Sequence, residues 1–237
     1  MKPSTLFTSD SMLPLHKETP KMRILDMGCG YAGLLRRLWK QGLVWRAVGC
    51  DIAAKMCEKA RVQNETIGAD ADITILEESY LSVSIPNESV DLVISMDALL
   101  HIGPQGHGAV AKEAYRCLRP GGWMIFCDIM EQETVDATEM QPIYDRIHLS
   151  KLGTVSNYQA CLEQAGFTKF HFEPHSGNVS THYGTVRKVL QVKGNSLSLS
   201  SDFIARMSAG LATWEKLAPK NIVWGFMFAQ KTEKAHH

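Results

Sequence analysis

The sequence predicts an α/β fold, with a doubly wound, mostly parallel sheet of seven strands and helices on both faces. From residue 22 onward, short apolar runs alternate with longer segments that are apolar on one helical face. The chain has 237 residues, 45% of them apolar and 21% charged, which suffices for one core. We therefore expect a single domain at 22–231 with halves at about 22–130 and 131–231, a short extension at 1–21 and a tail at 232–237.

Seven apolar runs have the length of buried strands. These are residues 22–28, 47–52, 73–76, 90–96, 123–130, 167–173 and 222–230. The turn residues Arg-Pro-Gly-Gly at 119–122 mark the start of the fifth strand, and we expect Asp128 to end it.

Six segments show helical periodicity, as in the first, where Leu34, Leu35 and Leu38 share a face. The expected helices are residues 33–41, 53–67, 105–118, 139–149, 154–165 and 201–217. His107 stands in a Gly-rich turn, and we expect it to face solvent.

Composition narrows the classes of partner. Lys+Arg and Asp+Glu are equal at 25 each, so no net field attracts nucleic acid or an acidic membrane. Because the chain shows neither a signal peptide nor an apolar run of about 20 residues, we expect a cytoplasmic protein with a small-molecule partner. The six cysteines form no C-x-x-C pair, which indicates reduced core residues and no metal site. The oligomeric state stays open.

A glycine-rich loop follows the first strand and opens the first helix. It reads Asp26-Met-Gly28-Cys-Gly30-Tyr-Ala32-Gly33. Gly28 and Gly30 permit a tight turn and let a ligand approach the backbone, and the helix start behind them favours an anionic group. By itself the loop fits a nucleoside site, a dinucleotide site or a purely structural turn.

A second signal is Asp51, at the carboxyl end of the second strand and 21 positions after Gly30. An acidic side chain there can accept hydrogen bonds from both ribose hydroxyls, or can simply begin the following helix. Both features fall at the carboxyl ends of parallel strands, where open α/β sheets bind ligands.

Four ordered stretches resemble the class I S-adenosylmethionine-dependent methyltransferases. They are ILDMGCGYAGLLRRL, VGCDIAAKM, SVDLVISMDALLHI and LRPGGWMIFCDIM, which together span residues 23–130. The resemblance implies the Rossmann-like methyltransferase fold, with an antiparallel last strand in its sheet. It also implies S-adenosyl-L-methionine as cofactor and S-adenosyl-L-homocysteine as product.

The resemblance also implies cofactor-binding residues. Asp26, Gly28 and Gly30 would surround the amino-acid part, and Asp51 and Ile52 the ribose and adenine. The remaining candidates are Ser79 and Tyr80 at the adenine edge and Asp97 and Leu99 on the methionine side, with core packing as the alternative for Leu99. A carboxylate such as Asp97 is favoured near a sulfonium cation.

The C-terminal half should hold the methyl acceptor. Arg146 can clamp a carboxylate with two hydrogen bonds, and aromatic faces such as Tyr183 and Trp224 can hold a methylated ammonium. The alternatives are that Tyr144 and Trp224 belong to the core and that Arg146 pairs with Asp145 or another acid on the surface.

This half is similar to the sarcosine/dimethylglycine methyltransferases of glycine betaine synthesis. The matching stretches are DALLHI, PIYDRIHLSKLGT, QAGF, STHYGTVRKVL and FIARMSAGLATWEKLAPKNIVWGFMF. The resemblance implies N-methylation of a small amino acid. His101 and His182 are then candidates to receive a proton from the amine, and Tyr31, Tyr183 or Trp224 would face the developing cation. His101 can equally be a residue of a helix entry.

One departure and three alternatives complete the expectation. Only 22 residues precede Arg23, fewer than in such methyltransferases, so we expect a shortened lid and a wetter reaction site. The alternatives are another small nucleophile (a phosphoamine, a thioether or a natural product), a catalytically impaired cofactor-binding protein, and a nicotinamide dehydrogenase.

Overall fold

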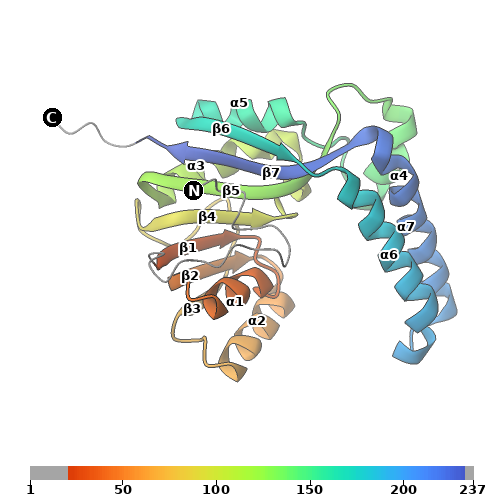
Figure 1. The fold of residues 1–237 in the computed structure, drawn as a ribbon, viewed down its shortest axis with the longest axis horizontal. Coiled ribbons are helices and arrows are strands. Elements are labelled where there is room, and N and C mark those ends of the chain that lie inside the picture. Colours follow the sequence, from red (N-terminus) through yellow and green to blue (C-terminus); the bar gives the residue numbers. More distant parts are fainter. Residues whose placement is uncertain (1–20, 233–237) are drawn as a thin grey trace.

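The computed structural model describes residues 21–232, which form a seven-stranded sheet with helices on both faces (Figure 1). The strands are β1 (Met22–Met27), β2 (Val44–Asp51), β3 (Ile73–Glu77), β4 (Val90–Met96), β5 (Leu118–Glu131), β6 (Phe167–Pro174) and β7 (Ile222–Lys231). Their order is β3-β2-β1-β4-β5-β7-β6. Strands β1 to β5 pair in parallel, whereas β7 runs antiparallel to both of its neighbours. The predicted fold class, with its antiparallel last strand, is confirmed.

Seven α-helices connect these strands. They are α1 (Gly33–Lys40), α2 (Ala54–Thr66), α3 (His107–Cys117), α4 (Ala137–Ile147), α5 (Val155–Ala165), α6 (Gly177–Lys193) and α7 (Ser201–Asn221). The described part of the chain also has three short 3-10 helices, at Leu99–Ile102, Pro104–Gly106 and Asn195–Leu197. No helix among residues 21–232 is long and apolar enough to cross a membrane. The predicted extension at 1–21 lies outside the described residues except for Lys21, and the tail except for Thr232.

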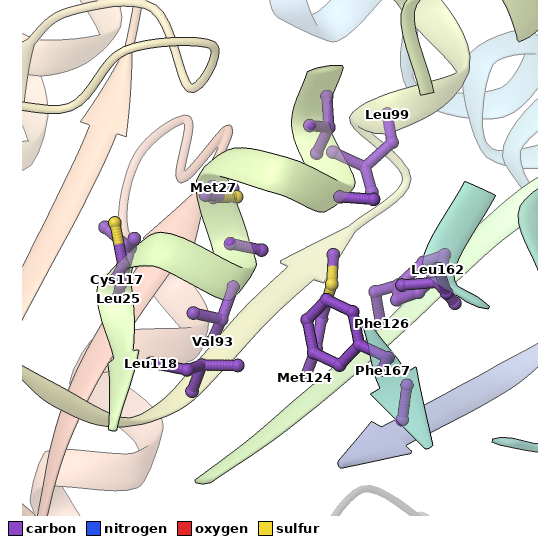
Figure 2. Close-up of a cluster of buried hydrophobic side chains, with 14 of the residues drawn as sticks. Leu25, Met27, Val93, Leu99, Cys117, Leu118, Met124, Phe126, Leu162 and Phe167 are labelled. Carbon is purple, nitrogen blue, oxygen red and sulfur yellow. The ribbon is translucent and has the colours of Figure 1, made fainter. Parts of the chain in front are cut away.

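Alternating strand residues divide the core between the two faces of the sheet. Helices α3 and α5 cover one face, where Leu25, Val93 and Phe126 are buried (Figure 2). Helices α1 and α2 cover the other face, over Ile24 and Ile94. This arrangement leaves the carboxyl edge of β1, β2 and β4 free for a ligand.

A third cluster lies at the carboxyl end of β5, around Ile129. There α4, α6 and α7 pack through Ile143, Tyr144, Val179, Trp214 and Leu217. In Figure 1 the long α6 and α7 stand beyond the arrowheads of β1 and β4. Helix α6 is an element that the sequence did not predict, because its apolar residues do not follow a clear helical stripe and its contacts come from α7.

The strand β5 differs from expectation in two ways. The Arg-Pro-Gly-Gly segment lies inside the strand as a bulge. In β4, Val90 pairs with Leu118 and Leu92 pairs with Trp123, so the intervening residues of β5 bulge out of the pairing. Asp128 does not end the strand, which continues to Glu131. Its carboxylate is fully buried and accepts a hydrogen bond from the Tyr158 hydroxyl, so the prediction for Asp128 was wrong.

The prediction that His107 faces solvent was also wrong. Its ring is 2% exposed, stacks on Tyr158 with centroids 3.9 Å apart, and lies 2.8 Å from the Asn157 amide oxygen. A 3-10 turn at Pro104–Gly106 brings His107 to the first position of α3, beneath α5. A Gly-rich local sequence does not reveal this long-range contact.

Candidate active site

The glycine loop after β1 is shaped by its backbone. The amides of Gly28 and Cys29 both donate to the Cys50 carbonyl, at 2.9 and 3.0 Å. Gly28 has φ +79°, and a Cβ there would collide with the side chain of Ala98. Gly30 has φ +51°, and a Cβ there would meet no atom within 4 Å. The loop therefore needs glycine for its conformation and leaves open space beside Gly30, which fits a ligand that lies against the backbone.

Asp51 joins this loop to the next helix. One carboxylate oxygen accepts from the Gly30 amide and the other from the Ala53 amide, each at 2.9 Å. The carboxylate is thus fixed in orientation and keeps lone pairs for further donors, as a ribose diol would supply. Ile52 follows with 76% of its surface exposed, which is unusual for an isoleucine and leaves an apolar face beside Asp51.

Asp26 lies at the end of β1 below the loop and is 3% exposed. Burial, together with the nearby charge of Asp51, raises the pKa of Asp26 to about 7. A cationic group placed beside it would favour the ionised form. The ammonium of an amino-acid ligand would be such a group.

Ser79 and Tyr80 follow β3. The Ser79 hydroxyl accepts from the Leu81 amide at 3.2 Å, and the Tyr80 hydroxyl donates to the Ala98 carbonyl at 3.3 Å. The Tyr80 ring reaches toward Gly28, since a Cβ at Gly28 would lie 3.7 Å from it. Tyr80 therefore lies between the glycine loop and the segment after β4.

Asp97 directly follows β4 and has the left-handed backbone conformation, with φ 50°. Its amide donates to the Cys127 carbonyl at 3.0 Å, and its carboxylate accepts from the Trp224 indole at 2.7 Å. A non-glycine residue in this conformation is strained, and such residues concentrate at functional sites. Leu99, predicted to lie beside Asp97 at the cofactor, is 1% exposed in the core, while Leu100 faces the cavity described next.

A cavity of about 430 Å³ opens beside Asp97. Its lining consists of Asp97, Leu100, His101, Ile129, Ile147, Asn178, Val179, His182, Tyr183, Trp214 and Trp224. The structure thus brings together three of the four predicted catalytic residues, His101, His182 and Tyr183. It adds Asn178 and Trp214, which no local sequence pattern singles out because α6 and α7 meet only through tertiary packing.

The fourth, Arg146, is absent from the described lining of this cavity. Its guanidinium lies against α7, where Gly210 has no side chain to obstruct it and the Met207 sulfur is 3.7 Å away. The alternative pairing with Asp145 is not what the structure shows, because the Asp145 carboxylate accepts from Gln141 at 2.6 Å. The charge of Arg146 weakly opposes the rise that burial causes in the pKa of Tyr183.

Aromatic rings form one side of the cavity. Tyr183 stacks on Trp214 with centroids 5.0 Å apart, and burial raises the pKa of Tyr183 to about 12, so its hydroxyl stays neutral. Trp224 presents its indole beside Asp97. Tyr144, by contrast, is a core residue whose hydroxyl donates to Glu131 at 2.6 Å. Tyr31 is 43% exposed and belongs to the glycine loop.

The sheet order, the glycine loop and the Asp51 carboxylate at the carboxyl edge define a class I S-adenosylmethionine-dependent methyltransferase. A family model described as a methyltransferase domain matches residues 24–122. The class predicted from the sequence and its cofactor are therefore confirmed.

Three relatives identify the family. The sarcosine/dimethylglycine N-methyltransferase of Halorhodospira halochloris is 34% identical over 90% of this chain and 76% of its own length. The dimethylglycine N-methyltransferase of Parasynechococcus marenigrum is 34% identical over 88% of this chain and 74% of its own. A crystal structure from Galdieria sulphuraria, described as a sarcosine dimethylglycine methyltransferase, has a TM-score of 0.84 and 28% identity over 91% of this chain and 80% of its own. The chain belongs to the family of the sarcosine/dimethylglycine N-methyltransferases.

Proposed function

We propose that this methyltransferase transfers a methyl group to the nitrogen of sarcosine, dimethylglycine or both, towards glycine betaine. The observation that carries the proposal is the cavity, where the Asp97 carboxylate and the indoles of Trp214 and Trp224 surround a space large enough for a small amine. A carboxylate and aromatic faces are the groups that stabilise a methylated ammonium. The relatives named above support the same acceptor class.

Residues in and around the glycine loop after β1 would hold S-adenosylmethionine, which supplies the methyl group as an electrophile when bound. We propose Asp26, Gly28 and Gly30 for its amino-acid part and Asp51 and Ile52 for its nucleoside. The open space at Gly30, the fixed carboxylate of Asp51 and the exposed face of Ile52 fit these roles. Ser79, Tyr80 and Asp97 complete the proposed set, whereas Leu99 packs in the core, which is the alternative expected for it.

Methyl transfer to an amine requires the protein to align the methyl donor with the acceptor nitrogen, and it requires no covalent bond to the protein. The amine must reach the site without its extra proton, and we propose that His101 or His182, which both line the cavity, accepts it. Tyr183 and Trp224 would then face the positive charge that develops on nitrogen. We propose that the positive charge of Arg146, which lies near Tyr183, attracts the carboxylate of an acidic acceptor without contacting it.

We propose that residues 22–231 work as one domain, because the cavity takes Asp97 and Ile129 from the first half and His182 and Trp224 from the second. A cytoplasmic protein without nucleic-acid or membrane partners fits the even balance of charge. The oligomeric state is left open.

The deciding experiment measures S-adenosylhomocysteine release from S-adenosylmethionine in the presence of glycine, sarcosine or dimethylglycine. We expect turnover with sarcosine, dimethylglycine or both. Phosphoethanolamine serves as the control acceptor, because the described lining contains no Lys or Arg to neutralise a phosphate. No turnover with either methylated glycine, or turnover with phosphoethanolamine alone, would overturn the proposal.

A further inference from the structure

Trp224 belongs to the C-terminal strand β7, yet its indole contacts Asp97, the residue that follows β4. The Trp224 nitrogen donates to the Asp97 carboxylate at 2.7 Å, across 127 positions of sequence. Both residues line the cavity. The Trp224 side chain is therefore a physical link between the acceptor-binding half of the chain and the cofactor-binding half.

Trp224 is itself held firmly from several sides. Its backbone amide donates to the Ser176 hydroxyl at 3.2 Å, and its carbonyl accepts from the His175 amide at 2.7 Å. The rings of His175 and Phe226 meet its indole edge to face, with centroids 6.4 and 5.5 Å away. These contacts fix the direction in which the indole N–H points, so it can orient a flexible partner.

Asp97 is the partner that needs orienting. Its backbone conformation is strained, with φ 50°, and the next residue, Ala98, packs against Gly28 of the glycine loop. A rotation of the Asp97 carboxylate would therefore change the charge presented to both the cofactor side and the acceptor cavity.

We propose that Trp224 is a positioning residue whose indole N–H fixes the Asp97 carboxylate beside the reacting groups. The inference rests on the proposed function in one respect, that this cavity is where acceptor and methyl donor meet. Three observations support the inference. They are the strained backbone of Asp97, the contacts that hold the Trp224 ring, and the hydrogen bond between the Trp224 indole and the Asp97 carboxylate.

The same hydrogen bond acts on the ionisation of Asp97. Desolvation by the surrounding protein raises the pKa of Asp97, although its side chain is open to the cavity, while the Trp224 bond and the charge of His182 oppose that rise. The other titratable groups around Asp97 are Cys127 and Asp128 from β5, Tyr183 from α6 and His101 from the 3-10 helix after β4. Loss of the indole donor should therefore raise the pKa of Asp97 further and leave more of it neutral.

The first test needs no variant of Trp224. The indole nitrogens of the five tryptophans of the full chain are labelled and followed by NMR against pH. We expect the indole resonances of Trp224 and of Trp39, which donates to the Asp72 carboxylate, to titrate in the wild-type chain. Only the Trp224 resonance should lose that titration in Asp97→Asn. If no indole resonance loses its pH dependence in Asp97→Asn, the hydrogen bond does not exist in solution and the inference is wrong.

The second test compares ligands that differ in charge at sulfur. S-adenosylmethionine carries a sulfonium cation, whereas S-adenosylhomocysteine is a neutral thioether. In Trp224→Phe we expect the affinity for S-adenosylmethionine, relative to S-adenosylhomocysteine, to fall by about tenfold, the scale of one hydrogen bond to a charged group. The acidic limb of kcat/KM against pH should move to higher pH in the same variant.

Trp39→Phe is the matched control, because the Trp39 indole donates to the Asp72 carboxylate at 2.9 Å. Trp39 lies at the C-terminal end of α1, which is the end away from the glycine loop. Trp39→Phe removes the same kind of bond, and we expect it to leave both the affinity ratio and the acidic limb unchanged. If Trp224→Phe behaves like Trp39→Phe, Trp224 has only a packing role. The binding and NMR measurements use no acceptor, so they stand even if neither sarcosine nor dimethylglycine is methylated.

Discussion

At the scale of single residues, the site is built from side chains whose charge is set by their surroundings. Asp51 is tied to two backbone amides, Asp97 to an indole, and Asp26 is buried with no cation beside it among the described residues. The raised pKa values of two carboxylates, Asp26 and Asp97, would therefore favour a ligand that brings positive charge. Perturbed carboxylates of this kind are typical of functional sites.

Asp26 gives a pH prediction. Its pKa is about 7 without ligand, so below that pH a ligand ammonium must displace a proton to pair with the carboxylate. We expect the affinity for S-adenosylhomocysteine to weaken as pH falls below about 7, by up to about tenfold per unit, with proton release on binding. Calorimetry in buffers of different ionisation enthalpy measures the released proton. Asp26→Asn should bind more weakly and release none; wild-type affinity that is constant below pH 7 would contradict the role of Asp26.

At the scale of elements, the antiparallel β7 strand decides where the acceptor side of the site lies. It inserts between β5 and β6, and its register places Trp224 opposite Ile129, another cavity residue. Gly225 pairs with Asp128 on one side and Pro174 on the other. A Cβ at Gly225 would collide with the Glu173 carbonyl and come within 2.7 Å of the Phe172 ring.

Gly225→Ala should therefore destabilise the chain by about 1–3 kcal/mol, the usual cost of overpacking a close contact. Urea unfolding followed by circular dichroism measures the free energy of unfolding. Gly108→Ala is the control, because a Cβ there meets nothing within 4 Å and alanine favours the helix α3 by up to about 1 kcal/mol. Equal stabilities of the two variants would show that β6 and β7 can separate without cost.

At the scale of the whole molecule, both halves of the chain contribute to one cavity and one sheet. The sheet order runs from β3 through β5 to β7 and β6 without a break. We expect residues 22–231 to unfold in a single transition. S-adenosylhomocysteine at about 100 times its dissociation constant should raise the free energy of unfolding by about 2.7 kcal/mol. Calorimetry checks both; two transitions, with only one shifted by the ligand, would show separate domains.

Local sequence determined much of this protein. Strand β4 lies where its apolar run predicted, and the glycine loop and Asp51 meet as their spacing implied, because parallel strands bring their carboxyl ends to one edge. Class, cofactor and family followed from residues that act over short distances or in a fixed order along the sheet.

The acceptor cavity was decided by tertiary structure. Arg146 lies against α7, and His107 and Asp128 are buried. The Trp224 indole donates to Asp97, which is 127 positions away in the sequence. The sequence contains no local signal for these contacts. They depend on how α4, α6 and α7 pack together, on the position of α5 over His107 and Asp128, and on the insertion of β7 beside β5. Periodicity fixes which residues share a face of one element, whereas only the packing of elements fixes which faces meet.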